Sequence, residues 1–111
     1  MSDFSTRTTE SGVVVVQPAG RLTIVAAPAL RKQLNDIVDG GGRRIVVDLS
    51  ATEFIDSSGL GALIAALKIA RNAGGDLRIA APSEQVCTVL ELSSLDRVLR
   101  AYPAADSAFD E

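Results

Sequence analysis

The chain contains no histidine and a single cysteine, Cys87, among its 111 residues. Without histidine it lacks the side chain that enzymes use most often as a general base and proteins use most often as a metal ligand. One cysteine cannot form an internal disulfide bond, and we expect Cys87 to be a small packing residue in an apolar helix. We therefore predict no metal site and no cofactor.

Basic runs and long apolar runs are missing as well. The net charge is -3 and the densest basic pair is Arg43-Arg44, so we expect neither nucleic acid nor an anionic membrane as a partner. The strongly apolar run at residues 13–16 is far shorter than the roughly 18 residues of a membrane span. The polar N-terminus has no apolar centre of a secretory signal. A cytoplasmic location follows.

The residues that are present describe one small globular protein. Hydrophobic residues make up 47% of the chain and charged residues 23%, which is typical of a single domain with one core. We expect this domain to span residues 1–111, with an ordered core of about residues 4–103. The small, acidic segment 104–111 is expected to fray.

Strand and helix patterns alternate along the chain. Strands are predicted at residues 4–9, 12–17, 21–24, 45–49 and 76–81, and helices near 27–39, after 57 and from 83, with a last turn or strand at 95–102. The last helix carries Val86, Val89 and Leu90, with Leu92 as a further candidate for burial. These patterns predict an α/β fold: an N-terminal hairpin, then a mixed, mostly parallel sheet with helices packed on it.

The helix after Ser57 has two apolar sides. One side carries Leu60, Leu63, Ile64, Leu67 and Ala70 and is expected to pack on the sheet. The opposite side carries few charges, and we call Ala62, Ala65 and Ile69 the docking strip. The strip is explained either by the helix propensity of alanine or by a partner that covers it.

The start of this helix has the sequence DSSGLG, residues 56–61. Asp56 or Ser57 suits the N-cap, which makes the hydroxyl of Ser58 redundant for capping and a candidate phosphorylation site. Gly59 and Gly61 each cost roughly 1 kcal/mol in a helix. We interpret them as clearance for the backbone of a partner.

Phosphate on Ser58 is compatible with the fold. It adds about -1.5 to -2 charges at pH 7, which the N-terminus of a helix tolerates or favours. A phosphate dianion on a docking surface would be repelled by acids of the partner or would lose its hydration at a high cost in free energy. We therefore predict that phosphorylation releases the partner. A hydrolase with Ser58 as nucleophile is the rival interpretation. It lacks a histidine base, and the surrounding residues do not form a G-x-S-x-G turn.

Residues 45–50 (IVVDLS) and 54–61 (FIDSSGLG) resemble the signature of bacterial anti-sigma factor antagonists, which are small single-domain STAS proteins. Supporting landmarks of the same family are residues 20–22 (GRL), 74–77 (GGDL), 89–92 (VLEL) and 95–96 (LD). The resemblance covers nearly the whole chain, and the DSSGLG core is its most specific part.

The resemblance implies a regulator and not an enzyme. Such an antagonist binds an anti-sigma factor that is also a serine kinase, and thereby frees a sigma factor. Phosphorylation of the second serine, here Ser58, releases the antagonist from the kinase, and a PP2C-type phosphatase removes the phosphate again. Asp56 and Ser57 would shape the kinase-binding site.

Thr23 is a departure from the family, because many members have an acid at this position. It belongs to the predicted partner-binding residues, and the threonine puts the strength of the kinase contact in question. The alternative function is a STAS module of another partner-switching, stress-signalling or transport system. We expect a monomer, with weak self-association through the docking strip as the other option.

Overall fold

The computed structural model describes residues 4–109. Within this range the strands are β1 (Ser5–Thr8), β2 (Val14–Gln17), β3 (Gly20–Leu22), β4 (Arg44–Asp48), β5 (Thr52–Ile55), β6 (Asp76–Ala80) and β7 (Ala101–Tyr102). The helices are α1 (Ala27–Asp39), α2 (Ser57–Asn72) and α3 (Glu84–Leu92), with the short 3-10 turns η1 (Leu95–Arg97) and η2 (Ala105–Ser107).

The strands form one central sheet and one small accessory sheet. The central sheet has the order β1-β2-β4-β6-β7; β1 is antiparallel to β2, and the other neighbours are parallel. A hairpin followed by a mostly parallel sheet was predicted, and both are confirmed. The accessory sheet is a parallel pair of β3 and β5. Its strands lead directly into α1 and α2, and it therefore fixes where both helices begin.

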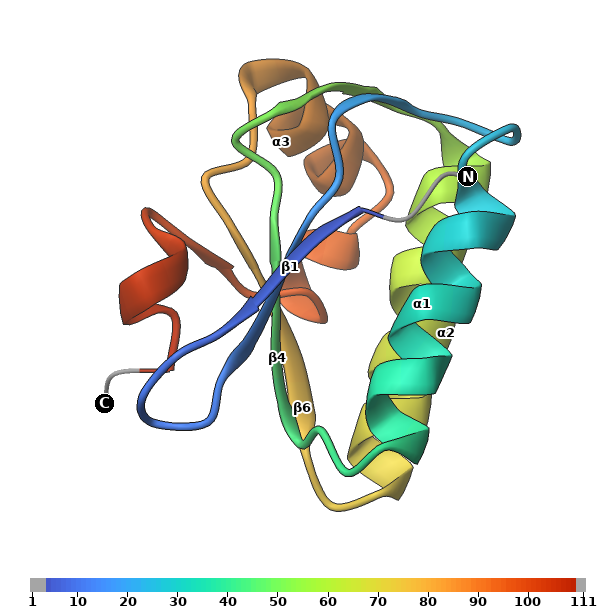
Figure 1. Cartoon of the computed structure of the whole chain (residues 1–111). Helices are drawn as coiled ribbons and strands as arrows, with labels where there is room; N and C mark the ends of the chain where they lie inside the picture. Colours follow the sequence, from blue (N-terminus) through green and yellow to red (C-terminus); the bar gives the residue numbers. More distant parts are fainter. Residues whose placement is uncertain (1–3, 110–111) are drawn as a thin grey trace.

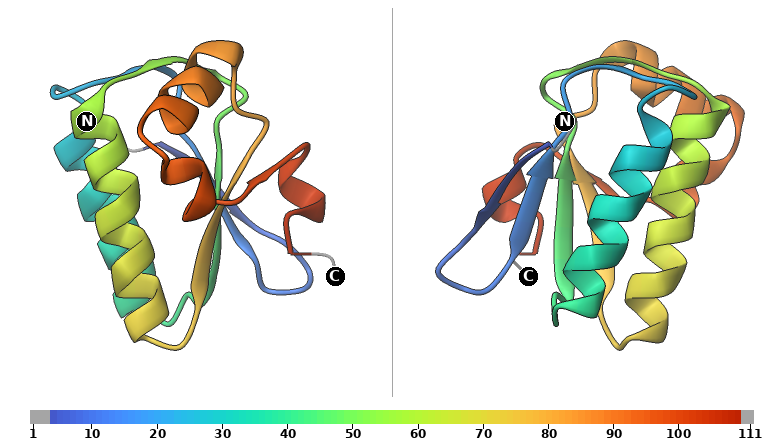
Figure 2. Two further views of the ribbon diagram at one scale, coloured as in Figure 1. Left: turned by 180° about the vertical axis from the view of Figure 1, so that it is seen from behind. Right: turned by 45° about the vertical axis from the view of Figure 1, so that its right-hand side comes forward.

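Helices α1 and α2 lie side by side on one face of the central sheet and start at the same end of the molecule (Figures 1 and 2). Leu30 and Leu34 of α1 and Leu63 and Leu67 of α2 are buried in the core between the helices and the sheet. The predicted sheet-facing side of α2 is thus confirmed. Burial of this apolar area is the main contribution to the stability of the fold.

Helix α3 begins after Ser83, whose hydroxyl accepts a hydrogen bond from the amide of Val86. Val86 and Leu90 are buried, as predicted. Leu92, the further candidate, is 83% exposed, so its predicted burial is wrong. Two residues correspond to about 200° around a helix, which turns Leu92 away from the side that carries Leu90.

The C-terminal segment covers the other face of the central sheet (Figure 1). Ala105 and Ala108 are buried there against residues of the sheet, Val13, Val15, Val46 and Ala80. The guanidinium of Arg78 lies 5.4 Å from the ring centre of Tyr102 and 4.2 Å from that of Phe109. The prediction of a frayed tail is therefore wrong for residues 104–109, and residues 110–111 lie outside the described range.

None of the helices in the described range is long and apolar enough to span a membrane.

Candidate functional site

Helix α2 begins at the DSSGLG sequence, and its first turn is the centre of the site. Asp56 is the N-cap: its backbone is extended, and its Oδ1 accepts a hydrogen bond of 3.0 Å from the amide of Gly59. This decides between Asp56 and Ser57, both of which suited the cap. Ser57 is exposed and Ser58 is half-buried. Neither serine is needed to hold the helix start, so both hydroxyls are available for other contacts.

Ser58 lines an open hollow of about 290 Å³ between the starts of α1 and α2. Gly61 and Ala62 of α2 line it too, and Ile24 closes it from the β3–α1 loop. The remaining lining residues belong to α1 and are Ala27, Pro28 and Arg31. The wall is mainly apolar, with one hydroxyl and one cation.

Thr23 lies in the same loop and is half-buried. Its carbonyl accepts hydrogen bonds from the amides of Ala26 (3.0 Å) and Ala27 (2.8 Å), which helps to start α1 in the absence of a side-chain cap on that helix. Thr23 does not line the hollow. Its position beside Ile24 nevertheless keeps it next to the surface around Ser58.

Gly59 has an internal role that the sequence did not reveal. It is buried, and a Cβ built on it would lie 2.3 Å from the carbonyl oxygen of Leu22 and 2.8 Å from Cγ1 of Ile55. The clearance at Gly59 is therefore used by strand β3, which contradicts its interpretation as space for a partner. Gly61 differs, because it is exposed and its Cβ would meet no atom within 4 Å.

The docking strip is only partly open. Ala62 is 4% exposed and faces residues of α1 across the hollow, while Ala65 and Ile69 are half-buried. The expectation of an exposed strip is thus wrong for Ala62. The physical reason is that small residues on α2 let α1 of the same chain approach closely. The predicted partner helix is, for this residue, an internal one.

Two apolar residues beside the hollow were missed by the sequence analysis. Ile24 is 70% exposed and Val25 is 87% exposed, in the loop between β3 and α1. Branched apolar residues are costly to leave in water at such positions and commonly mark interaction surfaces. The signal in the sequence was a pair of β-branched residues after a short strand, where polar turn residues are usual.

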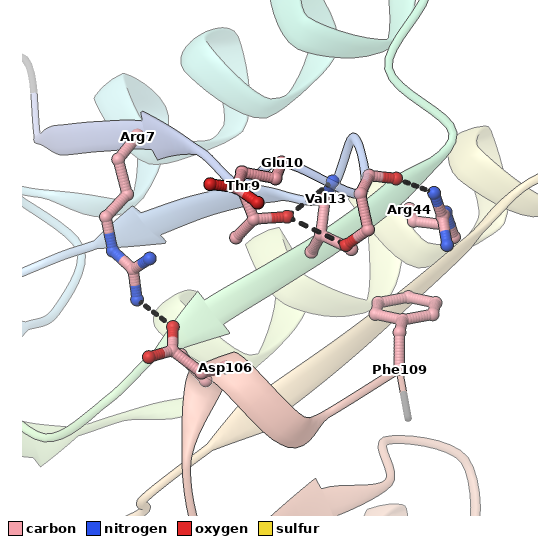
Figure 3. Close-up of a pocket in the computed structure, with 9 residues that line it drawn as sticks. Arg7, Thr9, Glu10, Val13, Arg44, Asp106 and Phe109 are labelled. Carbon is pink, nitrogen blue, oxygen red and sulfur yellow. Dashed lines mark hydrogen bonds and ion pairs between the residues drawn. The ribbon is translucent and has the colours of Figure 1, made fainter. Parts of the chain in front are cut away.

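A larger hollow of about 480 Å³ lies on the other face of the sheet, where the C-terminal segment meets β1 and β2 (Figure 3). Both arginines that line it are paired within the chain: Arg7 with Asp106 at 2.6 Å, and Arg44 with the carbonyl of Ser11. The hollow lies where the C-terminal segment packs against the sheet. It contains none of the predicted site residues.

The lining of the hollow limits what the hydroxyl of Ser58 can do chemically. No acid is among the residues that line its hollow, so nothing there is placed to remove the proton of its hydroxyl. Residues 4–109 also contain no group of three or more histidine, cysteine or acidic side chains that could hold a metal ion.

Comparison with known proteins assigns the family. A model of the STAS domain matches residues 5–108. A candidate anti-sigma factor antagonist from Thermotoga maritima is 34% identical over 100 residues, which cover 89% of this chain and 88% of that protein. The crystal structure of a candidate antagonist from the same organism has a TM-score of 0.88 at 31% identity and covers 96% of this chain and 92% of that one.

A relative and a structural neighbour from Bacillus are less similar. The anti-sigma-B factor antagonist of Bacillus subtilis is 26% identical over 86 residues, with 78% of each chain covered. The Bacillus cell fate determinant SpoIIAA in its phosphorylated form shares the fold, with a TM-score of 0.74, 21% identity and 96% of each chain covered. With the family model over residues 5–108 and the Thermotoga relative over most of its length, the chain belongs to the STAS domain family and resembles its anti-sigma factor antagonists.

Proposed function

We propose that this protein is an anti-sigma factor antagonist that binds an anti-sigma factor with serine kinase activity and is released when that kinase phosphorylates Ser58. The observation that carries the proposal is the position of Ser58. Its hydroxyl is not required as a helix cap, and it lines an open hollow that no acid or histidine shares. The names of the Thermotoga and Bacillus subtilis relatives support the target class.

The proposed contact surface surrounds Ser58. It comprises Ser58 and Gly61 of α2, together with the exposed Ile24 and Val25 and the neighbouring Thr23. Exposed apolar residues beside the small residues Ser58 and Gly61 allow a partner to approach closely and to bury apolar area. Asp56 contributes indirectly, because its carboxylate holds the turn that presents Ser58.

A phosphate on Ser58 leaves the fold intact under this proposal. The first amides of a helix have no intrahelical partner and attract an anion. The acid at this helix start is the N-cap Asp56, which precedes the first turn and whose Oδ1 accepts the amide of Gly59. Binding of the partner is weakened, because the phosphate dianion would have to lose its hydration in the middle of an apolar contact. A penalty of about 3 kcal/mol corresponds to roughly a hundredfold loss of affinity, because each 1.4 kcal/mol is about tenfold.

Intact-mass measurement tests the modification. The purified protein is incubated with ATP and with candidate anti-sigma factors of the histidine-kinase-like ATPase fold from the source organism. We expect the mass of one phosphate to be added to wild type and to Ser57→Ala, but not to Ser58→Ala. A mass gain that persists in Ser58→Ala would assign the phosphate to another residue and refute the proposal.

Binding measurements test the release. With ADP we expect a stable complex of the kinase with wild type and with Ser58→Ala, and at least about tenfold weaker binding of Ser58→Glu. Addition of ATP should dissociate wild type but not Ser58→Ala, and a PP2C-type phosphatase should restore binding. Equal affinity of the three forms would contradict a charge switch. Absence of any kinase complex would favour a STAS module of a different signalling or transport system.

A further inference from the structure

Arg31 is the one charged residue among those that line the hollow of Ser58. It is exposed, and it makes no ion pair with any residue in the range 4–109. The neighbouring Lys32 differs, because its Nζ lies 3.0 Å from Oδ2 of Asp36 one turn further along α1. Arg31 has no such neighbour, since the residues three and four positions away on α1 are Ala27, Pro28, Leu34 and Asn35.

The geometry points to an arginine latch for the phosphorylated serine. Resting on the proposed phosphorylation of Ser58, we propose that the guanidinium of Arg31 binds the phosphate on Ser58 across the hollow between α1 and α2. A guanidinium donates two parallel hydrogen bonds to phosphate oxygens, and Arg31 and Ser58 line the same hollow from the two helices. The apolar wall formed by Ile24 and Ala62 reduces competition from water on one side of the pair.

The latch has a defined consequence for regulation. Arg31 holds the phosphate in the hollow itself, where the partner would otherwise contact Ile24 and Gly61. It also favours the dianion over the monoanion, because an adjacent positive charge lowers the second pKa of a phosphate from its usual value of about 6. The phosphorylated form thus keeps its full charge when the pH falls slightly below neutral.

The charges around the hollow support a test by titration. Arg31 is the only charged residue that lines it from α1, beside Ala27 and Pro28. From α2 and the β3–α1 loop the lining residues are uncharged: Ser58, Gly61, Ala62 and Ile24. The nearest acid in the sequence is Asp56, whose Oδ1 already accepts the amide of Gly59. Removing the charge of Arg31 therefore leaves no other lining group that would stabilise the dianion.

The experiment uses the full chain with phosphoserine installed at position 58 during translation, so that no kinase is needed. Phosphorus NMR follows the second ionisation of the phosphate in wild type, Arg31→Gln, Arg31→Lys and Lys32→Gln. We expect the phosphate pKa to be lower in wild type than in Arg31→Gln by about 0.5 to 1 unit, less than the shift of a buried pair because Arg31 is exposed. Arg31→Lys should give an intermediate value, and Lys32→Gln should titrate like wild type.

Two results overturn the latch. One is an equal phosphate pKa in wild type and Arg31→Gln, and the other is an equally large shift in Lys32→Gln, which would indicate only the general surface charge. The shift should also shrink when the salt is raised to about 1 M, where the screening length is about 3 Å. Because the phosphoserine is installed directly, failure of kinase transfer to Ser58 and failure of the latch are separate outcomes.

Discussion

The inner and outer sides of the first turn of α2 each carry a glycine, and the two glycines have different surroundings. On the inner side, Gly59 is in contact range of Leu22 and Ile55, and no side chain fits between them. On the outer side, Gly61 faces open space beside Ser58. Gly59 thus allows strand β3 to pack closely against α2, whereas Gly61 leaves space beside Ser58 for a partner under the proposed function. We therefore predict that substitutions on the inner side lower the stability of the protein, whereas those on the outer side weaken binding of the partner.

The largest effect is expected for Gly59→Ala on the inner side. The new Cβ would overlap the carbonyl oxygen of Leu22, so strand β3 or helix α2 has to move. Overpacking typically costs about 1 to 3 kcal/mol, and the gain of helix propensity offsets only about 1 kcal/mol. Because the overlap is with a backbone oxygen, we expect the upper end of this range, a net loss of up to about 2 kcal/mol in the free energy of unfolding, measured by urea denaturation. A variant as stable as wild type would show that the inner contact is unimportant.

A smaller effect, on binding alone, is expected for Ile24→Ser at the outer side. Ile24 is 70% exposed in the free protein, so its removal should change stability by less than about 0.5 kcal/mol. If it anchors the partner, the affinity for the kinase should fall by about 1 to 2 kcal/mol. Leu92→Ser is the matched control, since Leu92 is 83% exposed at the end of α3. Equal losses in both variants would contradict a contact surface centred on Ser58.

A small gain in stability, together with a modest loss of binding, is expected for Gly61→Ala. Its Cβ meets no atom within 4 Å, and alanine is favoured over glycine in a helix by up to about 1 kcal/mol. We expect the protein to become more stable by about 0.5 kcal/mol while its affinity for the kinase falls several-fold. Thermal denaturation and titration calorimetry measure the two quantities. An unchanged affinity for the kinase would contradict the proposal that Gly61 leaves space for the partner.

Local patterns were sufficient to predict the three helices and most strands of the central sheet, but not β5 of the accessory sheet. The apolar spacing of Leu63 and Leu67 identified the sheet-facing side of α2, and the DSSGLG sequence located the helix start. The contact between Gly59 and Leu22 could not be predicted, because it joins distant parts of the chain through the accessory sheet. The sequence around Gly59 does not indicate a contact with Leu22, and the sequence around Leu22 does not indicate one with Gly59.

The tail was mispredicted for a related reason. Ala105 and Ala108 lie in a small, acidic segment that has no apolar run, yet they are buried because the residues beneath them on the sheet are apolar. The guanidinium of Arg78 also contacts the rings of Tyr102 and Phe109, and hydrophobic periodicity does not detect such contacts. Ala62 shows the same limit, since the sequence indicated that something would cover it but not that α1 would.

The two edges of the central sheet bear on how a partner can bind. At one edge, β1 consists of Ser5, Thr6, Arg7 and Thr8, all exposed and polar, and at the other edge β7 is only two residues long. Polar and short edge strands disfavour the addition of a strand from another chain. Strand addition would rely on main-chain groups, which a phosphate on Ser58 does not touch. Under the proposed function, a partner that instead binds side chains at the helix starts contacts the phosphate on Ser58 directly, so one covalent change can control the whole complex.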